Sequence, residues 1–123
     1  MAAYNWILFT DRCPSCGDSC DFRAQTHVAS DYDGDETGRF HDRTYALGES
    51  MRWWPTEDPR HSAWKQGTLR TGSLPEDEDE EACYTTCPSC GKELFAVIRF
   101  RRHAAQQILR IGDTENWPAD HYR

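Results

Sequence analysis

The sequence predicts a single, mostly-β domain assembled from two similar halves. Its 123 residues suffice for one domain. The pentapeptide Cys-Pro-Ser-Cys-Gly occurs twice, at residues 13–17 and 87–91. Each copy is followed by a segment with strand character: residues 21–28 alternate apolar and polar side chains, and residues 94–100 form the most apolar run of the chain. We therefore expect a strand, a cysteine turn and a second strand in each half.

The remaining elements follow in order along the chain. The apolar residues 6–9 precede the first cysteine turn and are expected to form a strand. We predict a β-rich insertion at 31–54, with two strands around Gly48. A mobile acidic loop is predicted at 55–82, where proline, glycine, serine and charged residues dominate. Residues 104–112 are expected to form either a short C-terminal helix or an edge strand.

The four cysteines of the two turns are predicted to bind one metal ion. A Cys-x-x-Cys turn directs two sulfurs at one point, and Zn²⁺ prefers four such donors in a tetrahedron at about 2.3 Å. Structural Zn²⁺, one per chain, is the expected cofactor, and iron is an alternative that a four-thiolate site also suits. Two thioredoxin-like dithiols are disfavoured, because a redox fold needs one such pair at a helix N-terminus. The predicted ligands are Cys13, Cys16, Cys87 and Cys90.

Two further cysteines mirror each other around these turns. Three residues separate Cys20 from the first turn's second cysteine, and three separate Cys83 from the second turn's first cysteine. Burial in the core is the favoured interpretation, while a second metal site and a redox-sensitive pair stay open. Asp31, Asp33 and Asp35 have the spacing of a calcium loop, but the pattern departs from an EF-hand, and a solvated acidic turn is favoured.

Charge and composition indicate a protein partner. The formal net charge is −7, and residues 76–81 are all acidic. This balance disfavours binding that depends on phosphate contacts, whereas it would attract a basic protein. Of five tryptophans in the chain, we predict that Trp53, Trp54 and Trp64 are exposed and form the partner-binding surface. The alternative, equally supported, is that these rings cover a thin core.

The alternative function is nucleic-acid binding or a transcription-associated role. Arg99, Arg101 and Arg102 form the one basic cluster of the sequence, although the acidic run is expected to neutralise it. The sequence contains none of the hydrolase, base-deaminase or phosphate-loop motifs that we considered. We therefore predict that the chain is not an enzyme and that it has no small-molecule substrate. A redox sensor that uses Cys20 and Cys83 is the third hypothesis.

The expected location is the cytoplasm, without membrane contact. The first ten residues lack the basic region of a secretory signal, and no apolar stretch is long enough to cross a bilayer. A reducing compartment also keeps thiols available for a metal ion.

The two cysteine turns and the strands around them resemble the zinc-ribbon fold group. Tyr45, Gly48 and Trp53 are also similar to the Tyr-x-x-Gly-Asp-x-x-x-Trp segment of small, free-standing bacterial zinc-ribbon proteins, with Glu49 in place of the aspartate. The resemblance covers about half the chain and implies architecture rather than activity. Together with the acidic composition, it leads to the hypothesis of a zinc-stabilised interaction module for a basic protein. An immunity protein against a cationic bacterial toxin is the sharpest version of that hypothesis.

Overall fold

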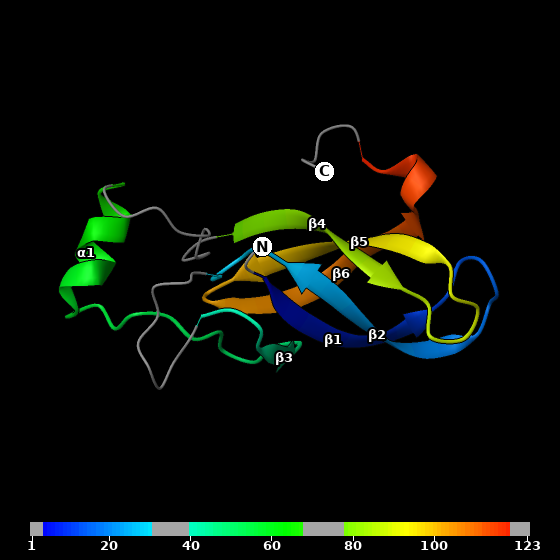
Figure 1. The fold of residues 1–123 in the computed structure, drawn as a ribbon, viewed down its shortest axis with the longest axis horizontal. Helices are drawn as coiled ribbons and strands as arrows, with labels where there is room; N and C mark the ends of the chain where they lie inside the picture. The colour runs from blue at the N-terminus through cyan, green and yellow to red at the C-terminus, as the bar shows by residue number, and fades with distance from the viewer. Residues whose placement is uncertain (1–3, 31–39, 68–77, 119–123) are drawn as a thin grey trace.

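A computed structural model describes residues 4–30, 40–67 and 78–118 of the chain. These residues form a six-stranded sheet with the order β3-β1-β2-β4-β5-β6, together with a short α-helix and a 3-10 helix. The sheet is curled, and the mostly-β prediction is confirmed (Figure 1). The elements are β1 Asn5–Arg12, β2 Ser19–Thr26, β3 Thr44–Ala46, α1 Pro59–Lys65, β4 Glu78–Thr86, β5 Glu93–Arg101, β6 Ala104–Asp113 and η1 Thr114–Asn116.

Two antiparallel hairpins contain the cysteine turns. The first hairpin is β1–β2 and the second is β4–β5, and each is paired along its whole length. Between them, β2 and β4 pair only at Ala24–Thr85 and Gln25–Tyr84, and each strand continues beyond the other. The two connecting turns lie at the same end of the sheet, opposite α1 (Figure 1). The strands predicted at 6–9, 21–28 and 94–100 are therefore confirmed.

The core lies on one face of the curled sheet. Alternate residues of a strand point to the same face, and the two hairpins contribute fully buried residues from that face, Ile7, Phe22, Leu94, Ile98 and Phe100 among them. A second, smaller cluster on the other face contains Ala82, Phe95 and Val97.

Three aromatic residues of the segment before α1 pack together in the main core. The Phe40 ring lies 5.0 Å from the ring of Trp53 and 5.0 Å from that of Trp54. Trp53 and Trp54 are only 9% and 4% exposed. The prediction that they form an exposed binding surface is therefore wrong, and the alternative, that the rings cover the core, is the correct one. Trp64 of α1 is partly buried against Trp53, with ring centroids 5.7 Å apart.

The insertion predicted at 31–54 contains one short strand in its described part. β3 pairs in parallel with β1, and Ser50 forms only an isolated bridge to Ala104. The chain turns at Gly48, where φ is +82°, but the second predicted strand is absent from residues 40–54, because Met51 N–H donates to the carbonyl of His103 at 2.6 Å in the β5–β6 turn instead of pairing with β3. The buried amide of Asn5 fixes the insertion to the first hairpin. It donates to Phe40 O at 2.9 Å and accepts from Arg43 N at 3.1 Å.

The segment predicted as a mobile loop at 55–82 contains regular structure at both ends. Asp58 caps α1 by accepting from Arg60 N, and Pro59 occupies its first turn. Gly67, with φ of +75°, follows the helix, so the usual helix start and stop residues are present in the sequence. β4 begins at Glu78, inside the acidic run, and residues 68–77 lie outside the described part. The loop prediction is wrong for α1 and for the start of β4.

The C-terminal segment forms an edge strand and a cover for the small cluster. β6 pairs with β5, so the helix predicted at 104–112 is wrong and the edge-strand alternative is correct. Trp117, after η1, packs against Tyr84 and Phe95, with ring centroids 4.6 and 5.9 Å apart. Within the described ranges, no helix has the length and apolar character needed to cross a bilayer.

Candidate metal centre

The four predicted ligand sulfurs lie together where the two cysteine turns meet. All four lie within 4.8 Å of one another. The Sγ–Sγ distance is 3.9 Å between Cys13 and Cys90 and 3.8 Å between Cys16 and Cys87. A tetrahedron with metal–sulfur bonds of about 2.3 Å has edges of about 3.8 Å, so this donor set fits a tetrahedral metal ion. The predicted cluster is confirmed, and its four cysteines are placed to bind one ion.

Each cysteine turn is folded by its own backbone. In both turns the glycine N–H donates to the carbonyl of the turn's first cysteine at 2.9 Å. Gly17 and Gly91 have φ of +81° and +75°, a conformation that costs other residues about 1–2 kcal/mol. Besides the sulfur contacts, Ser89 Oγ donates to Asp18 Oδ2 at 2.7 Å and connects the two turns. The pentapeptide therefore determines each half of the centre locally, and the sheet brings the halves together.

Backbone N–H groups point at the inner sulfurs of the centre. The N–H of Cys90 lies 3.4 Å from Cys87 Sγ and lowers the pKa of Cys87 to about 6. The N–H groups of Ser15 and Cys16 lie 3.4 and 3.5 Å from Cys13 Sγ in the same manner. At Cys87 the N–H of Cys90 favours the thiolate, which is the form that binds a metal ion. Cys13 and Cys87 are buried, whereas Cys16 and Cys90 are exposed.

The two mirrored cysteines occupy different environments. Both are buried, as the favoured interpretation predicts, with exposed fractions of 8% for Cys20 and 1% for Cys83. Cys20 Sγ lies 3.9 Å from Cys87 Sγ, beside the group of four. Cys83 Sγ instead donates to Glu81 Oε1 at 3.1 Å. Burial raises the pKa of both thiols. Cys20 therefore contacts Cys87, one of the four clustered cysteines, and not Cys83, its counterpart in the sequence.

Glu81 shows that part of the acidic run is structural. Its carboxylate accepts from Thr26 Oγ1 at 2.5 Å and from the N–H of His27 at 3.0 Å, and it faces His27 Nδ1 at 3.3 Å. Thr26 is fully buried, so this carboxylate satisfies a polar group that water cannot reach. Sequence reasoning missed this role. The sequence does contain one signal for it. Glu81 lies two and four residues before Cys83 and Thr85, and alternate residues of a strand point to the same face, so Glu81 faces inward with these two buried residues of β4.

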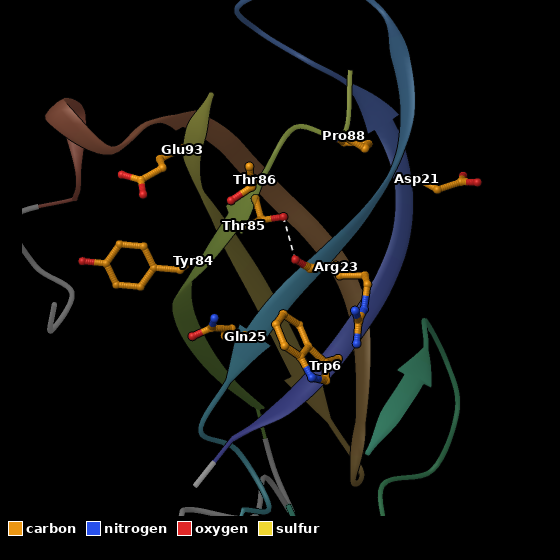
Figure 2. A pocket seen from close by; sticks show the side chains of 9 residues that line it. All are labelled: Trp6, Asp21, Arg23, Gln25, Tyr84, Thr85, Thr86, Pro88 and Glu93. Carbon is orange, nitrogen blue, oxygen red and sulfur yellow. Dashed lines mark hydrogen bonds between the residues drawn. The ribbon is translucent and has the colours of Figure 1, made fainter. Parts of the chain in front are cut away.

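A groove lies on the outer face, between the first hairpin and the second cysteine turn. Its volume is about 400 Å³, and its lining includes Trp6, Arg23, Tyr84, Asp21 and Glu93. Figure 2 shows these side chains around the place where β2 and β4 separate, with the hydrogen bond from Thr85 Oγ1 to Arg23 O at 2.7 Å beside them. The Arg23 guanidinium lies over the Trp6 ring, 4.2 Å from its centroid. Sequence reasoning did not find this groove, because its residues come together only through the brief β2–β4 pairing.

The predicted basic cluster lies at the end of the second hairpin. Arg99 Nε forms an ion pair with Glu78 Oε1 at 3.1 Å, so the start of β4 partly neutralises the cluster. Arg101 and Arg102 are exposed, and Arg102 and His103 form the tight β5–β6 turn with φ of +52° and +66°. Asp31, Asp33 and Asp35 lie outside the described residues.

The segment from Tyr45 to Trp53 has a structural role. Tyr45 Oη accepts from the N–H of Arg52 at 3.1 Å, and Glu49 Oε1 accepts from the N–H of Ala46 at 3.0 Å. These bonds fold the turn that carries Trp53 into the core.

Comparison of the chain with protein-family models, curated proteins and solved structures gave no match.

Proposed function

We propose that this protein is a non-enzymatic, zinc-stabilised module that binds a basic protein through the outer face of β1, β2 and β4. The observation that carries the proposal is the groove on that face, where apolar rings and carboxylates occur together. Trp6 is half-buried, and Leu8 and Tyr84 are 39% and 38% exposed. Aromatic side chains of this kind are the usual anchors of protein interfaces, and exposed apolar side chains that cluster indicate a partner.

Charge complementarity selects a basic partner. The groove lining contains two carboxylates, Asp21 and Glu93, and one cation, Arg23, within a chain of net charge −7. The Asp21 carboxylate is held in place by Thr10 Oγ1, which donates to it at 2.7 Å. Opposite charge accelerates association and disfavours wrong partners. The most specific form of the proposal is a bacterial immunity protein that covers the cationic surface of a toxin.

Zinc is the metal that this proposal requires. Four thiolates complete its tetrahedral coordination and leave no open position for a catalytic water, which suits a structural role. One Zn²⁺ per chain in metal analysis of the purified protein is the expected result. Iron in its place would give a coloured protein and would overturn the zinc assignment.

The test compares two pairs of charge-neutralising substitutions. The groove variant is Asp21→Asn with Glu93→Gln, and the control is Glu57→Gln with Glu115→Gln, which removes the same charge from exposed positions outside the groove lining. The wild-type protein is first used to retain a stoichiometric basic partner from its native cells. We expect the groove variant to raise the dissociation constant at least about tenfold and the control less than about twofold. No retained partner, or equal effects of the two variants, would refute the proposal.

Nucleic-acid binding remains the alternative function, and the exposed Arg101 and Arg102 at the tip of the second hairpin are the observation that favours it. The ion pair between Arg99 and Glu78 counts against it. Titration with DNA and RNA at increasing salt separates the two functions, because phosphate contacts give an affinity that falls steeply with salt. Tight binding near physiological salt, lost in Arg101→Ala with Arg102→Ala, would replace the protein-binding proposal.

A further inference from the structure

A fifth sulfur lies beside the metal centre. Cys20 Sγ is 3.9 Å from Cys87 Sγ, the same separation as between Cys13 and Cys90 within the centre. Yet Cys20 is not one of the four cysteines whose sulfurs all lie within 4.8 Å of one another. It therefore contacts one ligand without completing the ligand set. The Cys20 thiol also donates to the carbonyl of Asp18, at a longer distance of 3.6 Å.

We propose that Cys20 and Cys87 form a reversible oxidation site for small hydroperoxides. The Cys87 thiolate attacks the hydroxyl oxygen of the hydroperoxide, the O–O bond breaks, and a sulfenic acid is formed; the leaving group is hydroxide from hydrogen peroxide or an alkoxide from an organic hydroperoxide. The Cys20 sulfur then attacks Cys87, so that an S–S bond forms, the S–OH bond breaks, and the thiol proton leaves with the hydroxyl as water. Two electrons pass from the two sulfurs to the peroxide, and a small thiol in excess reverses the reaction.

The position of the pair gives this oxidation a defined consequence. Cys87 is the buried cysteine of the second cysteine turn, so its loss as a donor leaves Cys13, Cys16 and Cys90. Three donors do not close a structural site. The contact between the two hairpins at this end is thereby weakened, while the new S–S bond still joins β2 to the end of β4. Exposed fractions of 8% for Cys20 and 1% for Cys87 restrict the oxidant to a small molecule.

Cys83 provides a matched control within the same chain. It is also a buried thiol outside the ligand set, but its sulfur donates to Glu81 Oε1 and not to a sulfur. A general sensitivity of buried thiols would affect both cysteines. A role that depends on the contact with Cys87 belongs to Cys20 alone.

The experiment oxidises the metal-loaded protein with hydrogen peroxide. Metal content is measured first, so that a missing metal site is distinguished from missing Cys20 chemistry, and the partner plays no part in the assay. Peptide mapping should find a Cys20–Cys87 disulfide that dithiothreitol reverses. The readout is the metal binding that dithiothreitol restores after oxidation. Cys20→Ala should recover at least about fivefold less than the wild type, because an unresolved sulfenic acid at Cys87 is oxidised further to a sulfinic acid, whereas Cys83→Ala should stay within about twofold of the wild type.

Two results would overturn the proposal. One is a map in which the disulfides join only ligand cysteines, such as Cys13 to Cys90 or Cys16 to Cys87. The other is a recovery of metal binding after dithiothreitol in Cys20→Ala equal to that of the wild type. Should Cys20→Ala fail to retain metal, Cys20→Ser keeps the size of the side chain and replaces it in the recovery measurement. The disulfide map of the wild type decides the question without any variant.

Discussion

The two hairpins contain the same cysteine turn, but their outer faces differ. On the outer face of the second hairpin, the Trp117 ring lies 4.6 Å from that of Tyr84 and 5.9 Å from that of Phe95; Phe95 is buried there, and Tyr84 stays 38% exposed beside the groove. The first hairpin presents Trp6 and the 39%-exposed Leu8 on its outer face, next to the groove. A local motif therefore folds each half of the metal centre, whereas a residue distant in the sequence, Trp117, determines how much of the second hairpin's outer face is covered.

The largest expected effect tests the equivalence of the two turns. Metal binding by a four-thiolate set contributes about 10–16 kcal/mol to folding. The total stability of an ordinary domain is about 5–15 kcal/mol. We therefore expect Cys13→Ser and Cys87→Ser to unfold the protein to the same extent, as removal of metal by a strong chelator should. Far-UV circular dichroism and metal analysis provide the measurement. If one variant stays folded, the two turns are not equivalent.

A smaller effect should distinguish the covered outer face from the open one. Trp117→Ala removes a ring that packs on Tyr84 and Phe95, and we expect a loss of about 2–3 kcal/mol in the free energy of unfolding. Trp6→Ala removes a half-buried ring with Arg23 above it, and the loss should stay below about 1 kcal/mol. Urea unfolding of both variants measures the difference. Equal losses would mean that the outer face of the first hairpin is as well packed as that of the second.

Alanine at the turn glycines should destabilise both hairpins equally. Gly17 and Gly91 have positive φ, and a Cβ at either position would have no atom within 4 Å, so only the backbone conformation resists the substitution. We expect Gly17→Ala and Gly91→Ala each to cost about 1–2 kcal/mol in thermal unfolding of the metal-bound protein. Asparagine at the same positions, which tolerates positive φ, serves as the control and should cost less. An alanine effect at only one glycine would contradict the local origin of the turns.

The smallest expected effect concerns the contact between the end of β2 and β4. The hydrogen bond with Glu81 raises the pKa of His27 above its ordinary value. The stabilisation is therefore fully present below the unfolded pKa of about 6.5 and is lost as the pH rises through the folded value. Because the His27 side chain is 63% exposed, we expect no more than about 0.5 kcal/mol, reduced by salt. Unfolding measured from pH 5.5 to 8 should show a pH dependence that His27→Gln lacks; an unchanged dependence would exclude this pair as its source.

Sequence reasoning succeeded where the relevant interactions are local. The cysteine turns need only their own glycine and backbone, and the alternating and apolar runs identify β1, β2 and β5. It failed at Trp53 and Trp54, whose burial depends on Phe40 and on the turn at Gly48. It also failed at the start of β4, where cross-strand arginines offset the low strand propensity of acidic residues. The helix α1 was missed although Asp58, Pro59 and Gly67 mark its ends.

The amino-acid sequence by itself determined the identity of the four metal-site cysteines and the mostly-β character of the chain. Both follow from patterns among residues close together in the sequence, which can be recognised without the tertiary structure. Only the tertiary structure decided between Cys20 and Cys83, which occupy mirrored positions in the sequence. Their difference arises because β2 and β4 pair only at Ala24–Thr85 and Gln25–Tyr84, an offset that brings Cys20 against Cys87 of the other hairpin. Cys83 instead contacts Glu81, two residues away on its own strand. The same offset forms the groove, because β2 and β4 separate beyond their two paired positions and leave a space that Trp6, Arg23 and Tyr84 line.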